Sequence, residues 1–312
     1  MGTQKRTWIV AFILMALLLS SGSALAKEKP AWNPPPYFAP EHYAEIEGMK
    51  ICYVEAGEAG APAIVFIHGW SGDIMNWWDQ YEYFKDNYHV VILDDPGHGK
   101  SERRDDIKYS MPLDGKVVVG LMDYLGIKKA VLVGNSMGGH IVAWVAINYP
   151  ERVEKLVLSD AAGSSDLRWL AGLLPLVNPT TLKLLNMDSG DQYKQDNPKN
   201  QARHEFIASF PGTSEEKPYL RALSRSLKSL ALEPIKNDLP KITAPTLLIW
   251  GDNDPLVKPK VMDAFAARIP DTKRYLVPQG GHTPQMDTPA EFNCAVDKFV
   301  RGENMEDCRA KP

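Results

Sequence analysis

The chain has 312 residues, of which 44% are hydrophobic and 24% are charged. This is the composition of an ordinary globular protein, so disordered, collagen-like and coiled-coil chains are excluded. The net charge of −4 leaves no basic excess for binding nucleic acid or an anionic membrane. The three cysteines include no C-x-x-C pair, which excludes zinc ribbons and thioredoxin-type redox sites.

Residues 1–26 are predicted to be a signal peptide and not part of the fold. Lys5 and Arg6 precede an uncharged apolar run, and small residues ending in Ala24-Leu25-Ala26 follow it. Such a pattern directs secretion, and the run is short for a spanning helix. We therefore expect an exported protein, periplasmic or secreted, with no stable membrane span after cleavage. An uncleaved segment would instead anchor the chain in the membrane.

The mature chain is expected to begin with an arm and to continue as an α/β core. Five prolines within residues 27–40 predict an extended arm across the surface. Apolar runs such as AIVFI and TLLIW then alternate with helix-like stretches, which is typical of a doubly wound, mostly parallel sheet. The predicted strands are 49–55, 63–67, 90–94, 130–133, 155–158, 246–250 and 274–277. The predicted helices of the core are 77–86, 112–125, 137–149, 258–268 and 289–301.

The alternation stops between residues 163 and 238, which predicts an inserted helical cap. Four amphipathic stretches fill this segment, at 167–174, 180–185, 199–210 and 219–230. The core is therefore expected to span 41–162 and 239–302, followed by a tail at 303–312. Apolar cap residues such as Trp169 and Leu173 are expected either in the core of the cap or in the wall of a substrate site.

Gly134-Asn135-Ser136-Met137-Gly138 directly follows a predicted strand and leads into a predicted helix. In that context G-x-S-x-G is typical of a nucleophile elbow, a sharp turn that presents the serine hydroxyl above the edge of a sheet. The alternative is a glycine-rich turn with an ordinary serine. The elbow interpretation makes Ser136 the candidate nucleophile.

A serine nucleophile needs a base and an acid that orients the base. In elbow-bearing folds the chain order is serine, acid, histidine, which points to His282 in a glycine-rich loop after the last strand. Asp252 and Asp254 both follow the preceding strand, and spacing alone does not choose between them. Asp160, at the end of another strand, is an alternative acid for which a structural role is favoured.

The oxyanion that forms at a reacting carbonyl needs backbone N–H donors. His68-Gly69-Trp70 directly follows a strand, so the N–H groups of Trp70 and Met137 are the candidates. His68 could serve as a second base, but a structural role in steadying this loop is favoured. Trp77, at the start of a nearby helix, could line a substrate pocket or pack in the core.

Two other patterns do not predict cofactor sites. Gly99-Lys100-Ser101 ends like a P-loop, but position 94 is Asp where the first glycine should stand. Asp252-Asn253-Asp254 lacks the later ligands of a calcium loop. We therefore expect no metal and no organic cofactor.

The chain resembles the α/β-hydrolase fold, in its cap-bearing esterase, lipase and C–C hydrolase branch. The resemblance covers about residues 49–302 and rests on five motifs in the family's order: HGW at 68–70, DDPGHGKS at 94–101, GNSMGG at 134–139, WGDNDP at 250–255 and GGHTPQMDTPAEF at 280–292. It implies that Asp254 is the acid. Several motifs are similar to those of meta-cleavage C–C hydrolases, but the first loop reads HGWSGD without their usual further Gly-Pro, and those enzymes are cytoplasmic.

The leading interpretation is an exported serine hydrolase that cleaves small-molecule carboxylic esters through Ser136, His282 and Asp254. The first alternative is hydrolysis of a C–C bond in a vinylogous diketone. The second is a non-catalytic ligand-binding protein on the same scaffold, because fold does not determine function. The sequence gives no indication of oligomeric state. Cys294 and Cys308, on either side of the end of the last predicted helix, could form a disulfide, and spacing leaves that pairing open.

Overall fold

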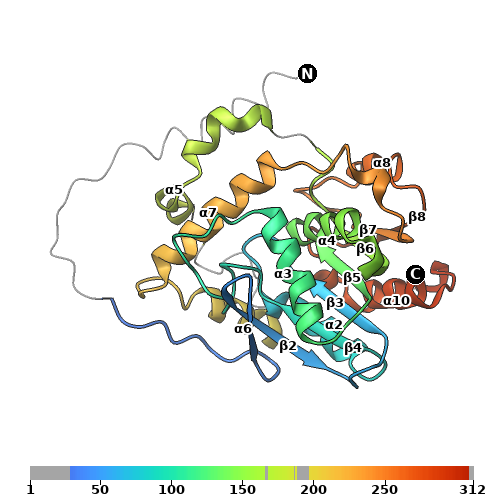
Figure 1. Ribbon diagram of the computed structural model, residues 1–312, viewed down its shortest axis with the longest axis horizontal. Helices are drawn as coiled ribbons and strands as arrows, with labels where there is room; N and C mark the ends of the chain where they lie inside the picture. The colour runs from blue at the N-terminus through green and yellow to red at the C-terminus, as the bar shows by residue number, and fades with distance from the viewer. Residues whose placement is uncertain (1–28, 166–167, 186, 188–196, 309–312) are drawn as a thin grey trace.

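The computed structural model describes residues 29–165, 168–185, 187 and 197–308 (Figure 1). The expected signal peptide, residues 1–26, lies outside the described residues, as does the end of the tail. No helix among the described residues is long and apolar enough to cross a membrane.

Within the described residues, eight strands form one sheet in the order β1-β2-β4-β3-β5-β6-β7-β8. The pairs β1–β2 and β2–β4 are antiparallel, and all other neighbours are parallel. The strands are β1 (His42–Ile46), β2 (Met49–Ala56), β3 (Ala63–Ile67), β4 (His89–Leu93), β5 (Ala130–Asn135), β6 (Val153–Ser159), β7 (Thr246–Gly251) and β8 (Thr272–Val277). The mostly parallel, doubly wound sheet predicted from the sequence is confirmed.

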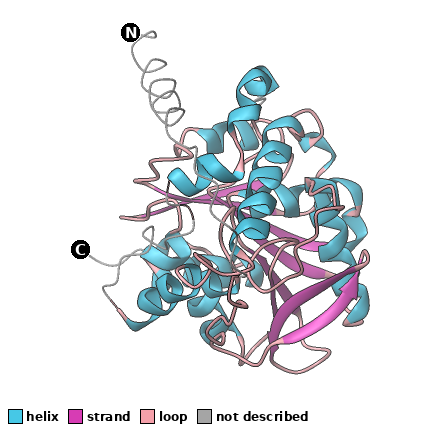
Figure 2. Ribbon diagram, turned by 90° about the vertical axis from the view of Figure 1, so that its left-hand side faces the viewer, coloured by secondary structure: helices cyan, strands magenta, loops and turns pink. Residues whose placement is uncertain are grey.

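Helices cover both faces of the sheet, so the protein has a hydrophobic core on each side (Figure 2). Alternate residues of β3 divide between the two cores: Val65 and Ile67 face one, and Ile64 and Phe66 face the other. The first core includes residues of α3 (Met111–Tyr124), α4 (Met137–Asn148) and α8 (Val261–Ala266). The second includes residues of α2 (Trp78–Phe84) and α10 (Pro289–Arg301). Short helices η2 (Ile74–Trp77), η3 (Pro150–Arg152), η5 (Leu239–Lys241), α9 (Pro284–Asp287) and η6 (Glu306–Cys308) complete this part of the chain.

The strand β1 is not among the predicted strands. It forms a hairpin with β2 through a two-residue turn in which Glu47 and Gly48 both have positive φ, 52° and 71°. Such turns match the natural twist of two paired strands. The sequence HYAEI buries only two of its five side chains, so it lacks the apolar run by which the other strands are recognised.

The inserted segment between β6 and β7 is helical in its described part. It contains η4 (Arg168–Leu176), α5 (Pro179–Leu184), α6 (Pro198–Ile207) and α7 (Glu216–Leu232). The first of these is a 3₁₀-helix with Pro175 inside it, because proline lacks the N–H that an α-helix needs at an interior position. The segment leaves the sheet at the carboxyl end of β6 and returns to it at β7.

The described part of the arm, from residue 29, has no regular secondary structure before β1 and contacts the inserted helices. The ring of Trp32 stacks on Phe210 at 4.5 Å between centroids, and its indole N–H donates to Ser209 Oγ at 2.9 Å. The N–H of Ser214 donates to Pro30 O at 2.9 Å. The arm therefore ties the insertion to the body of the protein.

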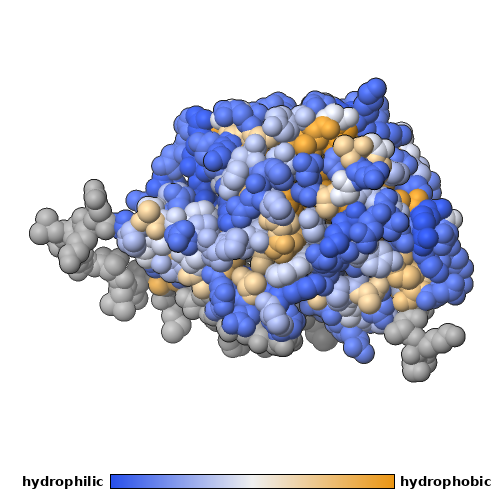
Figure 3. Space-filling model, turned by 90° about the horizontal axis from the view of Figure 1, so that it is seen from below, coloured by the Kyte–Doolittle hydropathy of each residue, from blue (hydrophilic) through white to orange (hydrophobic). Residues whose placement is uncertain are grey.

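A disulfide joins Cys294 on α10 to Cys308 on η6, with 5.6 Å between the Cα atoms. The pairing that the spacing left open is therefore formed. Cys52 is buried in β2 as a free thiol. Seen from below, the surface is mostly hydrophilic and its apolar residues lie in separate small areas (Figure 3).

Candidate active site

Ser136 stands at the turn from β5 into α4 with a left-handed backbone, φ 54° and ψ −112°. The two glycines of the motif are required by close packing around this turn. A Cβ on Gly134 would lie 2.2 Å from Gly138 O, and a Cβ on Gly138 would lie 2.2 Å from Ile67 O. Side chains at both positions are therefore sterically excluded. The half-buried serine is held above the sheet in the strained turn that the motif predicts.

His282 connects Ser136 to Asp254. It lies in the loop between β8 and α9, and Asp254 lies in the loop after β7. The distance from His282 Nδ1 to Asp254 Oδ2 is 2.8 Å, and that from His282 Nε2 to Ser136 Oγ is 2.9 Å. Because the carboxylate only accepts, Nδ1 carries the hydrogen and Nε2 accepts from the serine hydroxyl. The structure thus brings the three predicted residues together in one hydrogen-bonded chain.

The Asp254 carboxylate is buried and well supplied with donors. Its Oδ1 accepts from the N–H groups of Leu256 at 2.7 Å and Val257 at 2.9 Å. Burial alone would raise the pKa of Asp254, but the hydrogen bond and charge of His282, together with the two amides, lower it below its ordinary value. Asp252 is exposed, and its carboxylate accepts from Asn253 instead. The geometry therefore separates the two aspartates that spacing alone did not.

The two candidate oxyanion donors belong to chain segments that lie next to Ser136. Met137 is the first residue of α4, and neither its N–H nor that of Trp70 donates to another described residue. A Cβ on Gly69 would come within 3.2 Å of Ser136 Cβ, so the loop that carries Trp70 lies against the serine. The indole N–H of Trp70 donates to Leu223 O on α7 at 2.8 Å, which links this loop to the inserted helices.

His68 fills a structural position behind the same loop. It is fully buried, its Nδ1–H donates to Gly69 O at 2.7 Å, and its Nε2 accepts from Asp95 N–H at 3.0 Å. Burial lowers the pKa of His68 to about 4, so the ring is neutral near pH 7. These contacts are those of a residue that steadies the loop.

The three residues considered for substrate contact are placed differently. Trp77 is fully buried, with its ring 5.0 Å from Phe66 and 6.2 Å from Phe292 between centroids, which is the core packing that the sequence left as an alternative. Leu173 is half-buried on η4. Trp169 lies on the same helix, and its side chain is outside the described part of the structure.

Asn135 contacts the site although sequence reasoning assigned it no role. Its Nδ2 donates to the backbone carbonyl of His282 at 3.0 Å and thereby anchors the loop that carries the base. The only signal in the sequence was its position next to Ser136. Asp160, considered as an alternative acid, does not hydrogen-bond to His282. Instead its carboxyl group lies behind that of Asp254.

Among the described residues, one group of possible metal ligands is close together. It comprises Asp160, Asp254 and His282, whose ligand atoms lie within 4.8 Å of one another. A metal ion there would require the hydrogen bond between His282 and Asp254 to be given up. In the structure Asp254 and His282 instead form a hydrogen-bonded chain that leads to Ser136.

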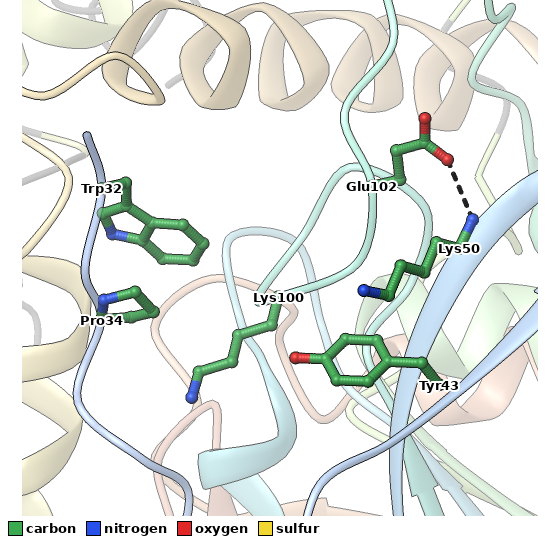
Figure 4. Close-up of a pocket in the computed structure, with 6 residues that line it drawn as sticks. All are labelled: Trp32, Pro34, Tyr43, Lys50, Lys100 and Glu102. Carbon is green, nitrogen blue, oxygen red and sulfur yellow. Dashed lines mark hydrogen bonds between the residues drawn. The ribbon is translucent and has the colours of Figure 1, made fainter.

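A separate cavity of about 540 Å³ opens between the arm and the β1–β2 hairpin (Figure 4). Its lining residues are Trp32, Pro34, Tyr43, Lys50, Lys100 and Glu102. Lys100 pairs with Glu41, and the backbone N–H of Lys50 donates to Glu102 at 2.9 Å. None of the predicted site residues lines this cavity.

The model of the alpha/beta hydrolase fold family matches residues 62–289. The chain belongs to this family.

A 2-hydroxy-6-oxononadienedioate/2-hydroxy-6-oxononatrienedioate hydrolase of Cupriavidus pinatubonensis is 30% identical over 78% of this chain and 88% of its own length. A solved membrane phospholipase A, described as a bacterial virulence factor, is 28% identical with a TM-score of 0.68, over 84% of this chain and 86% of that one. A thermophilic esterase from Thermogutta terrifontis shares the fold at a TM-score of 0.70 and 22% identity, over 85% of this chain and 99% of that one. The resemblance predicted from the five motifs is confirmed, since the relatives include meta-cleavage product hydrolases and esterases.

Proposed function

We propose that the protein is a serine hydrolase that cleaves carboxylic esters through an acyl-enzyme. The observation that carries this proposal is the chain of hydrogen bonds in which His282 accepts from Ser136 at 2.9 Å and donates to Asp254 at 2.8 Å. A serine hydroxyl is a weak nucleophile unless a base within hydrogen-bond reach takes its proton. This arrangement supplies both the base and the acid that orients it.

In the proposed mechanism Ser136 Oγ attacks the ester carbonyl while His282 Nε2 takes the hydroxyl proton. The Asp254 carboxylate stabilises the resulting imidazolium, and the N–H groups of Trp70 and Met137 donate to the oxyanion. Each such donor contributes about 3 kcal/mol to the transition state. The imidazolium then gives its proton to the departing alcohol. In the second half of the reaction His282 takes a proton from water, which attacks the acyl-enzyme carbonyl. The bond to Ser136 Oγ then breaks, Ser136 regains its proton from His282, and the carboxylic acid is released.

We propose that the inserted helices supply the wall of the acyl site. They are linked to the loop that carries Trp70 by the hydrogen bond from the Trp70 indole to Leu223 O on α7. The half-buried Leu173 on η4 is an apolar residue of this segment. Trp169 is proposed for the same wall from the sequence. A segment of this kind can exclude water from the reacting ester.

A second candidate is hydrolysis of a C–C bond. It is favoured by the relative from Cupriavidus pinatubonensis, which is 30% identical and is named as a hydrolase of 2-hydroxy-6-oxononadienedioate and 2-hydroxy-6-oxononatrienedioate. The likeness to a membrane phospholipase A, at 28% identity, supports ester cleavage. The same serine and histidine would serve either reaction, so the substrate must be tested directly.

The experiment is a panel of p-nitrophenyl esters from acetate to palmitate, run beside a meta-cleavage ring-fission product. We expect ester hydrolysis, labelling of Ser136 by a fluorophosphonate, and a loss of at least about 10³-fold in kcat for Ser136→Ala. Turnover of the ring-fission product alone would establish the second candidate. Neither turnover nor labelling would indicate a non-catalytic ligand-binding protein.

We also propose that the protein is exported to the periplasm or beyond. The support is the charged start, apolar run and A-x-A site of residues 1–26. Mass spectrometry of the protein from fractionated cells should give a chain that begins at Lys27. A full-length chain in the membrane fraction would mean an uncleaved anchor.

A further inference from the structure

Asp160 is a buried acid directly behind the proposed catalytic residues. It follows β6, which lies beside β7 in the sheet (Figure 1). Its side chain is fully buried, and its backbone is left-handed, with φ 45°. Positive φ is uncommon for a residue other than glycine and is best tolerated by Asp and Asn. A strained, buried carboxyl group of this kind needs an explanation.

The donors around Asp160 are few and neutral. Its Oδ1 accepts from the N–H of Gly251 at 3.0 Å, and its Oδ2 accepts from the hydroxyl of Ser159 at 2.9 Å. In the described part of the chain, the ionisable groups that face it are Asp254, from the loop after β7, and His282, from the loop after β8. The Nδ1–H of His282 already donates to Asp254, so His282 makes neither a hydrogen bond nor an ion pair with Asp160.

The carboxyl groups of Asp160 and Asp254 have oxygen atoms within 4.8 Å of each other. Two buried carboxyl groups at this separation are not both ionised, because their charges repel and neither is fully solvated. Asp254 accepts from two amides and an imidazole, so the negative charge belongs on Asp254. Burial, followed by the charge of Asp254, raises the pKa of Asp160 well above its ordinary value. The proton of the pair therefore resides on Asp160.

We propose that Asp160 is a neutral carboxylic acid that donates a hydrogen bond to the Asp254 carboxylate and thereby positions the acid of the site. The side chain of Asp160 makes its hydrogen bonds with Ser159 and Gly251 and not with Ser136, so its proposed role is that of a positioning residue. Its hydrogen bond holds the Asp254 carboxylate toward His282 and disperses part of the negative charge. A less concentrated negative charge then faces the ring of His282, whose Nδ1–H donates to Asp254 at 2.8 Å. The inference rests on the proposed function for its catalytic meaning.

Two substitutions separate this role from a structural one. Asp160→Asn keeps a side-chain donor, and Asp160→Gly removes the side chain, while both residues accept a positive φ. The principal readout is the titration midpoint of the His282 imidazole by NMR, which needs no substrate. Asp252→Asn, which removes an exposed carboxylate from the neighbouring loop, is the matched control.

We expect the midpoint of His282 to stay within about 0.3 pH unit in Asp160→Asn and to rise by about one unit in Asp160→Gly, since an undispersed carboxylate binds the imidazolium more strongly. On p-nitrophenyl butyrate, kcat/KM should fall about tenfold in Asp160→Gly, with most of this loss restored by Asn. A midpoint that falls by a unit or more in both variants would mean that Asp160 is ionised. An unchanged midpoint in Asp160→Gly would leave Asp160 a structural role only.

The titration also distinguishes failure of this inference from failure of the proposed function. If the wild-type protein hydrolyses no ester but the midpoint of His282 moves as expected, the carboxyl pair is correct and the reaction is wrong. If esters are hydrolysed and the midpoint does not move, the reaction is correct and Asp160 does not position Asp254.

Discussion

Asp252 and Asp254 lie two residues apart in one loop but have opposite environments. Asp254 is 1% exposed and shares its Oδ2 with the ring of His282, whereas Asp252 is exposed and contacts Asn253. An acid orients a catalytic histidine only from within hydrogen-bond reach. At the scale of single residues, the geometry therefore supports Asp254, and not Asp252, for that proposed role.

We predict that Asp254→Asn lowers kcat on p-nitrophenyl butyrate by a factor on the order of 10⁴, because an amide favours the wrong tautomer of His282. The matched control Asp252→Asn should cost less than about threefold, since its side chain is solvated. Steady-state kinetics of the two purified variants, with circular dichroism to verify folding, provide the measurement. A larger loss in Asp252→Asn would show that the acid is misassigned.

At the scale of elements, strands buried on both faces are the easiest to predict. Continuous apolar runs such as those of β3 and β7 have one physical explanation, a position between two layers of helices. The sequence did not predict β1, because an edge strand with a half-solvated face needs few apolar residues. Only two side chains of HYAEI are buried. The 3₁₀ form of η4 was also not predicted. Its leucines have the spacing of an amphipathic helix, but Pro175 prevents the α-helical hydrogen bonds.

The candidate site was predictable where local geometry demands particular residues. Ser136 is marked by glycines that have no room for a side chain, and His282 by chain order. The choice of Asp254 as the acid came from the family resemblance. Asp252 and Asp254 lie in one loop and differ only in the direction that the folded loop gives their side chains, which spacing does not predict. The role of Trp77 could not be predicted from the residue type. A tryptophan near the site is expected to be buried, but only the folded packing decides whether its ring contacts a ligand or, as here, Phe66 and Phe292.

The helix α4 carries a buried histidine, His140, that makes stability depend on pH. Burial lowers the pKa of His140 to about 4, from an ordinary value of 6.5. The unfolded chain therefore takes up a proton as the pH falls below 6.5, while the folded chain does not until about pH 4. Stability from this residue is fully present above pH 6.5 and is lost as the pH falls.

We predict that between pH 7.5 and pH 5 the wild-type protein loses about 2 kcal/mol more unfolding free energy than His140→Gln, which cannot take up the proton. Urea denaturation at the two pH values measures the difference. His42→Gln, which replaces an exposed histidine on β1, controls for loss of a histidine as such. Equal losses in the wild type and in His140→Gln would mean that His140 is protonated in the folded state.

At the scale of the whole molecule, segments far apart in the sequence converge on one cluster. The guanidinium of Arg103, in the loop after β4, lies 4.8 Å from the ring of Trp32, 4.9 Å from Phe210 and 5.7 Å from Tyr219. A cation over aromatic faces is stabilised by their quadrupoles, more so when desolvated. The arm, the core and the inserted helices are therefore packed around one buried charge.

We predict that Trp32→Ala lowers the unfolding free energy by about 2 kcal/mol, less than a fully buried tryptophan would, because Trp32 is half-buried. The loss should be local, since Trp32 stacks on Phe210 and donates to Ser209, at the end of α6. Amide hydrogen exchange should accelerate in α6 and the start of α7 while the sheet stays protected. Urea denaturation and exchange mass spectrometry measure the two effects.

Tyr124→Ala is the control for the loss of an aromatic ring, because Tyr124 is 61% exposed at the end of α3. It should change neither the unfolding free energy, beyond about 0.5 kcal/mol, nor the exchange of α6. If exchange in Trp32→Ala accelerates equally in α6 and in β5, the arm stabilises the fold as a whole. If α6 keeps its protection, the insertion is held by its own contacts with the core. Either result would contradict the view that the arm holds the inserted helices against the α/β core.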